Sequence, residues 1–92
     1  MKIEIISSRK IHCPACVDVK HYLKENKYKF IDLYVEDMPK YINTWEFRNF
    51  TGWPHVWIDG KFRFHGKPAY NVMKGIFNPK FHKVLNRKFK RG

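Results

Sequence analysis

The sequence predicts one α/β domain in which helices flank a four-stranded mixed sheet, with the element order β-α-β-α-β-β-α. Three observations predict this architecture. A strand, a helix and a second strand follow one another within the first 35 residues, a hairpin signal begins at His55, and helical spacing resumes at Tyr70. Because 92 residues suit one hydrophobic core, we expect a single domain over residues 1–92.

The first half of the chain is predicted to be a βαβ unit. Residues 2–6 and 29–35 are the predicted strands, since apolar side chains alternate along the second of them. Between them, Pro14 suits a first helical turn and Asn26 suits a helix end. The apolar residues of this helix recur at helical spacing: Ala15, Val19, Tyr22 and Leu23. A crossover helix joins parallel strands, so these two strands should be parallel.

The second half is predicted to hold a helix, a hairpin and a final helix. Pro39 should open the helix, which runs to about Phe50 with four apolar members: Tyr41, Ile42, Trp45 and Phe47. The pair Asp59-Gly60 suits a type I′ turn between two short strands. The final helical set is Tyr70, Met73, Ile76 and Phe77, and Asn78-Pro79 should break or kink the helix before a second set: Phe81, Val84, Leu85 and Phe89.

The net charge of +11 is unevenly distributed along the chain. Residues 1–59 nearly balance nine basic with eight acidic side chains, whereas residues 60–92 carry ten basic side chains and no acidic one. This pattern favours acidic partners, and we expect a basic helix or tail at about 79–92 that docks on the sheet or meets such a partner. Nucleic acid is a weaker expectation as the main partner, because most aromatic side chains occupy predicted core positions.

Two absences in the sequence bear on the compartment. There is no run of about 18 apolar residues that would span a membrane. The first eight residues lack the apolar core and the cleavage site of a signal peptide. We therefore expect a cytoplasmic protein, in which structural disulfides are rare and a close cysteine pair indicates catalysis or a metal.

The two cysteines of the chain, Cys13 and Cys16, are three residues apart. Cys13 is expected where a turn meets a helix, and there the free N–H groups and the helix dipole favour thiolate over thiol. Lys10 and His12 add positive potential. Cys16 lies one turn deeper and should be less ionised. Cys13 is thus the predicted nucleophile that forms a mixed disulfide, and Cys16 is the residue that resolves it.

Other interpretations of the cysteine pair stay open at this point. The pair could be half of a zinc site whose other ligands come from histidines: His12, His21, His55 or His65. It could also be idle in a small basic module that binds nucleic acid. The position of the pair after the first strand of a βαβ unit favours redox chemistry without a metal.

Several segments together carry a family resemblance. Lys10 stands three residues before Cys13, Thr51-Gly52-Trp53-Pro54-His55-Val56 leads into the third strand, and Gly66 follows the Asp59-Gly60 hairpin. In this combination the chain resembles the glutaredoxin family of the thioredoxin fold over about residues 2–77. The likeness extends to small phage-encoded glutaredoxins and to the redoxins that serve ribonucleotide reductase.

The resemblance implies a binding site as well as a fold. Pro54 would be cis and face the cysteines, and the Trp53 backbone would pair with the cysteinyl part of bound glutathione. Lys10 would meet the glycine carboxylate of glutathione, and Lys67 would meet the α-carboxylate of its γ-glutamyl residue. A peptide could also add to the Trp53 backbone in β-fashion.

Three places depart from the family's pattern, and the first is Gly52, which stands where the family has a threonine, with Thr51 one place early. Ala15 stands where the family usually has Tyr or Phe between the cysteines, and this opens the site. The segment Gly66-Lys67-Pro68-Ala69 has no carboxylate for the γ-glutamyl amino group. The same segment resembles the redoxins of ribonucleotide reductase, which thioredoxin reductase reduces.

The resemblance implies a thiol–disulfide oxidoreductase that reduces protein disulfides or mixed disulfides with glutathione. No tightly bound cofactor is expected, and glutathione would be the co-substrate. The alternative is a thioredoxin-reductase-dependent electron donor to ribonucleotide reductase.

Overall fold

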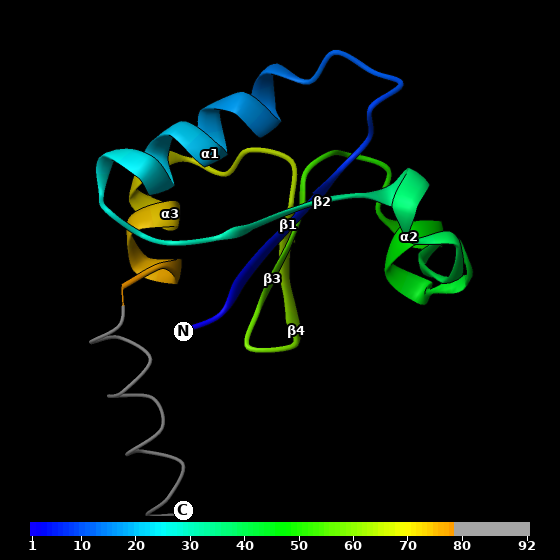
Figure 1. Cartoon of the computed structure of the whole chain (residues 1–92). Coiled ribbons are helices and arrows are strands. Elements are labelled where there is room, and N and C mark those ends of the chain that lie inside the picture. The colour runs from blue at the N-terminus through cyan, green and yellow to red at the C-terminus, as the bar shows by residue number, and fades with distance from the viewer. Residues whose placement is uncertain (79–92) are drawn as a thin grey trace, which may run out of the picture.

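The computed structural model describes residues 1–78. Its centre is a sheet with the strand order β2-β1-β3-β4, shown edge-on in Figure 1. The strands, in sequence order, are β1 (Ile3–Ser7), β2 (Ile31–Tyr34), β3 (His55–Ile58) and β4 (Lys61–His65). β1 runs parallel to β2 and antiparallel to β3, and β3 and β4 form an antiparallel hairpin. The predicted mixed four-stranded sheet is thereby confirmed.

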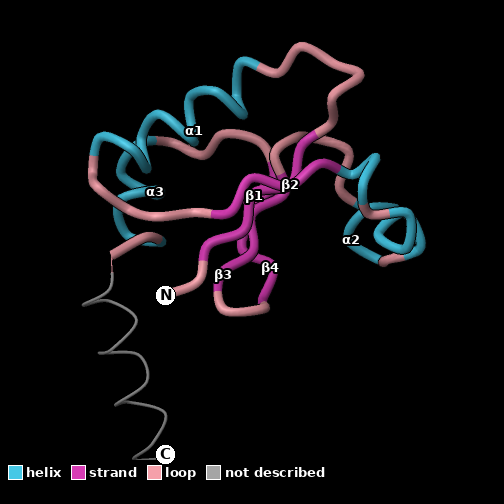
Figure 2. Tube along the Cα trace, in the orientation of Figure 1, coloured by secondary structure: helices cyan, strands magenta, loops and turns pink. Residues whose placement is uncertain are grey.

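Helices α1 (Pro14–Glu25) and α3 (Tyr70–Ile76) lie on one side of the sheet (Figures 1 and 2). α1 begins and ends as predicted, with Pro14 in its first turn and Asn26 as its C-cap. The core between these helices and the sheet consists of Ile3, Ile5, Val19, Tyr22, Leu23, Val56, Ile58, Met73 and Phe77. Burial of this apolar surface is the main force that fixes both helices on the sheet.

The opposite face of the sheet carries η2 (Pro39–Asn43) and α2 (Trp45–Asn49), which lie together in the two views. The prediction of one helix from Pro39 to Phe50 was wrong, because the backbone of Thr44 is extended (φ −78°, ψ 153°). The Thr44 hydroxyl donates to the Tyr41 carbonyl oxygen (2.7 Å) and accepts from the Phe47 N–H (3.3 Å). The side chain thus ends one element and caps the next.

The exposure of the residues before and in α2 also differs from the sequence prediction. Tyr41 is buried, but Ile42 and Trp45 are 47% and 64% exposed. A single helix would have placed these residues on one apolar stripe. The break at Thr44 separates them, so only part of the set reaches the sheet.

β2 is shorter than the predicted strand over residues 29–35. It covers Ile31–Tyr34, and Val35 begins a short 3-10 helix, η1 (Val35–Asp37). Because β2 is an edge strand, Ile31 stays 43% exposed, whereas Val35 is buried. β2 nevertheless pairs with β1 in the predicted parallel direction, for example with Ile6 opposite Leu33.

The β3–β4 hairpin contains an irregularity that the sequence does not reveal. The register shifts by one residue between Val56 and Trp57, so Val56 faces Phe64 and Trp57 faces Phe62. Phe64 packs against the α1/α3 core, while Phe62 stacks on Phe50 on the opposite face. A β-bulge explains why two residues of equal parity point to opposite faces.

The hairpin turn has the predicted conformation. Asp59 and Gly60 both have positive φ values (52° and 77°), as a type I′ turn requires. The turn is tied to the first strand, since the Asp59 carboxylate accepts from the Lys2 N–H (2.7 Å) and the Asp59 N–H donates to the Lys2 carbonyl (2.8 Å).

The predicted final helix is confirmed for its first half, because α3 spans Tyr70–Ile76 and buries Met73. The predictions of a kink at Asn78-Pro79 and of a basic helix or tail at about 79–92 fall outside the described residues. Within residues 1–78, no helix is long and apolar enough to cross a bilayer.

Candidate active site

Sheet topology brings three separate segments to one end of the molecule. β1 and β3 are antiparallel, with Ile6 opposite His55, so the chain leaves β1 where it enters β3. His65 at the end of β4 lies opposite His55 as well. The segments after Ser7, before His55 and after His65 therefore meet at the same edge. These segments hold all eight residues that the sequence singled out for the site.

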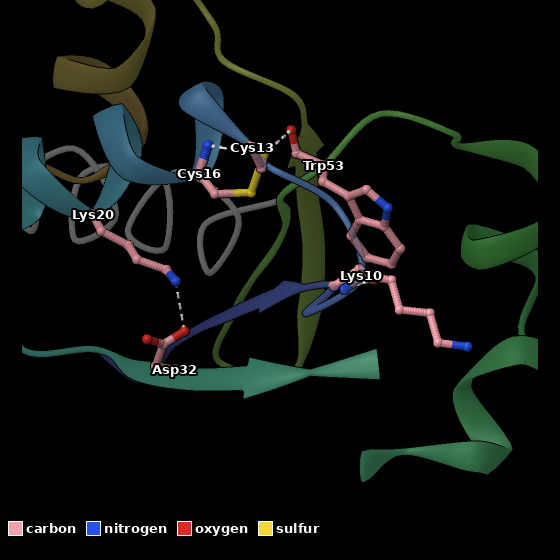
Figure 3. Close-up of a disulfide and its surroundings, with 7 residues drawn as sticks. Lys10, Cys13, Cys16, Lys20, Asp32 and Trp53 are labelled. Carbon is pink, nitrogen blue, oxygen red and sulfur yellow. Dashed lines mark hydrogen bonds and ion pairs between the residues drawn. A yellow bond between two sulfur atoms is a disulfide. The ribbon is translucent and has the colours of Figure 1, made fainter. Parts of the chain in front are cut away.

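Cys13 is the N-cap of α1 and forms a disulfide with Cys16 (Figure 3). The Cys16 N–H donates to the Cys13 sulfur at 3.2 Å, which is a backbone N–H of the kind predicted for a helix start. Cys16 is 4% exposed, whereas Cys13 is half-buried. The prediction that Cys16 lies deeper is thereby confirmed.

The loop before β3 faces this disulfide. The Cys13 Sγ lies 3.7 Å from the Trp53 carbonyl oxygen, and Figure 3 shows that carbonyl directed at the sulfur. The Trp53-Pro54 peptide bond is cis, as the family resemblance implied. Pro54 is buried, and its carbonyl oxygen accepts from the Gly66 N–H at 3.0 Å. Trp53, Pro54 and Gly66 are thus brought together beside the sulfurs.

The side chain of Lys10 extends away from the disulfide, past the Trp53 ring (Figure 3). It lines a shallow hollow of about 520 Å³ with Trp53, Phe47 and Ile42. The positive potential that we expected from Lys10 near Cys13 stays a prediction. The predicted role of Lys10, contact with a substrate carboxylate, stays a prediction as well.

Lys67 forms an ion pair with Asp18 of α1, with 3.1 Å between Nζ and Oδ2. Both side chains are about half exposed and line a hollow of about 410 Å³ between α1 and the segment before α3. Asp18 was not singled out from the sequence, because nothing in its local pattern shows that a loop 49 residues away returns to it. Ala15, half-buried between the cysteines, adds no polar group to the site.

A second ion pair lies beneath the start of α1. The Lys20 ammonium is 2.8 Å from the Asp32 carboxylate of β2, as Figure 3 shows. The Lys20 side chain is 18% exposed, and its ammonium also lies 5.6 Å from the centre of the Tyr34 ring. This pair ties α1 to the edge strand on the side of the helix that carries Cys16.

Behind the loop, His55 is fully buried and bonded at both ring nitrogens. Nδ1 lies 3.0 Å from the Tyr41 hydroxyl and Nε2 lies 2.8 Å from the Phe50 carbonyl oxygen. Burial lowers the pKa of His55 below 6.5, the largest effect, and the nearby His65 lowers it further. The hydrogen bond to Phe50 and the Glu46 charge act in the opposite direction. His55 is therefore neutral at pH 7.

The described residues contain no group of three or more His, Cys, Asp or Glu side chains that could hold a metal ion. His55, one of the histidines that a zinc site would have needed, uses both ring nitrogens in the bonds to Tyr41 and Phe50.

Comparisons with known proteins identify a family and a fold for the chain. A family model described as Glutaredoxin matches residues 3–63. A solved structure of NrdH-redoxin from Escherichia coli, a glutaredoxin-like protein with a thioredoxin-like activity profile, is similar, with a TM-score of 0.67. The two chains are 18% identical, and the match covers 86% of this chain and 97% of that one. At this identity, the likeness concerns the fold alone. No curated protein sequence matches the chain significantly.

A thioredoxin-like fold with a Cys-x-x-Cys pair at a helix start defines a thiol–disulfide oxidoreductase. The chain belongs to the glutaredoxin family. Its chemistry needs no tightly bound cofactor, only a reductant for the disulfide and a disulfide substrate.

Proposed function

We propose that the chain is a cytoplasmic electron donor that reduces protein disulfides or mixed disulfides with glutathione. The contact between the Cys13 sulfur and the Trp53 carbonyl carries this proposal, because it places the reacting atom beside free backbone. A substrate chain can pair with the Trp53 backbone as an added strand. The low exposure of Cys16 supports the assignment of Cys13 as the attacking residue.

The reaction runs in two exchanges. The Cys13 thiolate attacks one sulfur of the substrate disulfide, and the other sulfur leaves as a thiolate that takes up a proton. The Cys16 thiolate then attacks the Cys13 sulfur and releases the second substrate thiol. Two electrons pass from the dithiol to the substrate, and the protein ends as the Cys13–Cys16 disulfide.

The Asp18–Lys67 pair supports glutathione as the co-substrate. The γ-glutamyl residue carries an ammonium and a carboxylate on one carbon, and these two charges match the carboxylate of Asp18 and the ammonium of Lys67. Asp18 would supply from α1 the counter-ion that the segment after Gly66 lacks. An exposed pair of this kind contributes only about 0–1 kcal/mol to stability, so a ligand can replace it at little cost.

The second candidate is an electron donor to ribonucleotide reductase that thioredoxin reductase reduces. One observation favours it: the Gly66–Ala69 segment has no carboxylate of its own for the γ-glutamyl ammonium. The fold likeness to NrdH-redoxin is compatible with either reductant.

The test supplies each reductant separately to the purified protein and follows NADPH oxidation with insulin disulfide as the substrate. One reaction contains glutathione and glutathione reductase, and the other contains thioredoxin reductase. Turnover with glutathione supports the first candidate, and turnover with thioredoxin reductase alone supports the second. A protein that turns over with neither, although dithiothreitol reduces its disulfide, would contradict both.

A further inference from the structure

His55 lies next to the active-site loop, residues 51–54, and can fix its conformation. It is the first residue of β3, directly after Pro54, and its ring faces the α2 side of the sheet. The Trp53 ring packs over the His55 ring, with 4.5 Å between the ring centres and 31° between the planes. Its other ring neighbours are Tyr41, Phe62 and His65.

The hydrogen-bond partners fix the tautomer of His55. The Phe50 carbonyl oxygen can only accept, so Nε2 carries the proton and donates to it (2.8 Å). Nδ1 of the neutral ring is then an acceptor, and the Tyr41 hydroxyl donates to it (3.0 Å). The Trp57 Nε1–H donates to the Tyr41 oxygen at 2.9 Å. Every polar atom of this buried group has a partner, and the imidazole is held in one orientation.

The bond from His55 to Phe50 closes a short loop. Residues 51–54 lie between its two ends, and this loop contains the Trp53 carbonyl that faces Cys13. The far side of the loop packs against His65, since a Cβ on Gly52 would lie 3.1 Å from the His65 Nδ1. The Gly66 N–H fixes the Pro54 carbonyl. The hydrogen bond from His55 Nε2 to the Phe50 carbonyl, called the clamp below, is therefore one of the contacts that fix the position of the Trp53 backbone.

We infer that His55 is a positioning residue for thiol–disulfide exchange: its Nε2–H holds the Phe50 carbonyl and thereby keeps the Trp53 backbone beside Cys13. His55 does not touch the reacting sulfurs, so it acts through the loop. Displacement of a positioned group by about 1 Å can slow a reaction by up to about 10²-fold. The inference rests on the redox activity of the cysteine pair, whichever reductant serves it.

Two substitutions at His55 distinguish the effect of the clamp, the hydrogen bond to Phe50, from the effect of the ring's volume. In His55→Gln, the side-chain amide reaches the position of Nε2 and can still donate to Phe50. In His55→Asn, the shorter amide reaches only the position of Nδ1 and can bond to Tyr41 but not to Phe50. The Trp57→Phe variant is the stability control, because it removes a hydrogen bond of the same network at the end remote from the loop.

The experiment measures the second-order rate constant for oxidation of each fully reduced protein by a peptide disulfide, with thermal unfolding and amide exchange as companion measurements. The reduced state is prepared with dithiothreitol, so the result does not depend on the physiological reductant. His55→Asn should react about 10- to 100-fold more slowly and should exchange the Gly66 amide, which donates to the Pro54 carbonyl oxygen, faster. His55→Gln should stay within about threefold of the wild type.

Trp57→Phe should unfold at a lower temperature without a comparable loss of rate. Equal rate losses in His55→Gln and His55→Asn would overturn the inference, since the bulk of the ring would then matter and not its donor. An unchanged rate in His55→Asn would overturn it as well. If the wild type itself does not react with the peptide disulfide, the assigned redox function fails and not merely the role of His55.

Discussion

The sulfur of Cys13 and the carbonyl oxygen of Trp53 lie 3.7 Å apart, although 40 residues separate them in the chain. This contact exists because β1 and β3 are antiparallel neighbours, so the helix start after β1 meets the loop before β3. The contact is long-range and the Cys13–Cys16 pair is local. The site therefore depends on the sheet as much as on the motif.

The two cysteines should fail in different ways when substituted. Cys13→Ser removes the attacking sulfur and should lower disulfide-reductase turnover by at least about 10³-fold. Cys16→Ser leaves the attack intact but removes the resolving thiol, so a mixed disulfide on Cys13 should accumulate. Intact-protein mass spectrometry after exposure to a peptide disulfide distinguishes the two variants. Accumulation of the adduct on Cys16 in Cys13→Ser would reverse the assigned roles.

The Asp18–Lys67 pair should influence the use of glutathione. Asp18→Asn removes the carboxylate that would meet the γ-glutamyl ammonium, so the KM for glutathione should rise about 3- to 10-fold while the rate with dithiothreitol is unchanged. Glu25→Gln is the matched control, because Glu25 lines the same hollow but pairs with His21 (2.8 Å). Equal KM values for the wild type and Asp18→Asn would remove Asp18 from the binding site.

Two glycines that have open space around them should respond to alanine in opposite ways. Gly60→Ala places a side chain at φ +77° in the hairpin turn and should cost about 1–2 kcal/mol. Gly75→Ala lies inside α3, where alanine should add up to about 1 kcal/mol of stability. Thermal unfolding should show a shift of about 4–8 °C per kcal/mol for a domain of this size. A Gly60→Ala protein as stable as the wild type would contradict the type I′ turn.

Acid should destabilise the protein through His55. The pKa of His55 is lowered in the folded state, so below pH 6.5 the unfolded chain binds a proton that the folded chain excludes. The resulting loss of stability begins as the pH falls through 6.5 and ends at the folded-state pKa. The groups that face the ring are the Tyr41 hydroxyl, His65 of β4 and Glu46 of α2.

Urea unfolding at pH 7.5 and pH 5.5 measures this effect. The wild type should lose stability between the two values, and His55→Gln should lose less. The lowered pKa values of Glu36 and Asp37 act in a different window, because that stability is lost only as the pH falls below the ordinary values of about 4.5 and 3.8. The same pH dependence in His55→Gln and the wild type would assign the effect to another group.

Local signals in the sequence predicted the βαβ unit, the Asp59-Gly60 turn and the position of Cys13 at a helix start. These features depend on residues that are close in the chain: the apolar spacing of α1, the φ preferences of the turn residues and Pro14 in the first helical turn. The cis Trp53-Pro54 bond followed from the family resemblance rather than from the local pattern.

Features that depend on side-chain bonds to the backbone or on distant contacts could not be predicted from the apolar spacing. The hydroxyl of Thr44 competes for the backbone and divides a helix that the apolar spacing had favoured. A one-residue shift in the hairpin sends Phe62 and Phe64 to opposite faces. His55 is an ordinary strand residue in the sequence, and only the fold shows that it is buried between Tyr41 and the Phe50 carbonyl.

The most direct test of the redox assignment is a titration of the purified protein in glutathione buffers of defined potential, with the state of the Cys13–Cys16 pair and any adduct read by mass. We predict a reversible two-electron disulfide in the range of about −200 to −270 mV that covers glutaredoxins and thioredoxin. A transient glutathione adduct on Cys13 would accompany it if glutathione is the reductant. A Cys13–Cys16 pair that forms no reversible disulfide at any potential would rule out a thiol–disulfide oxidoreductase.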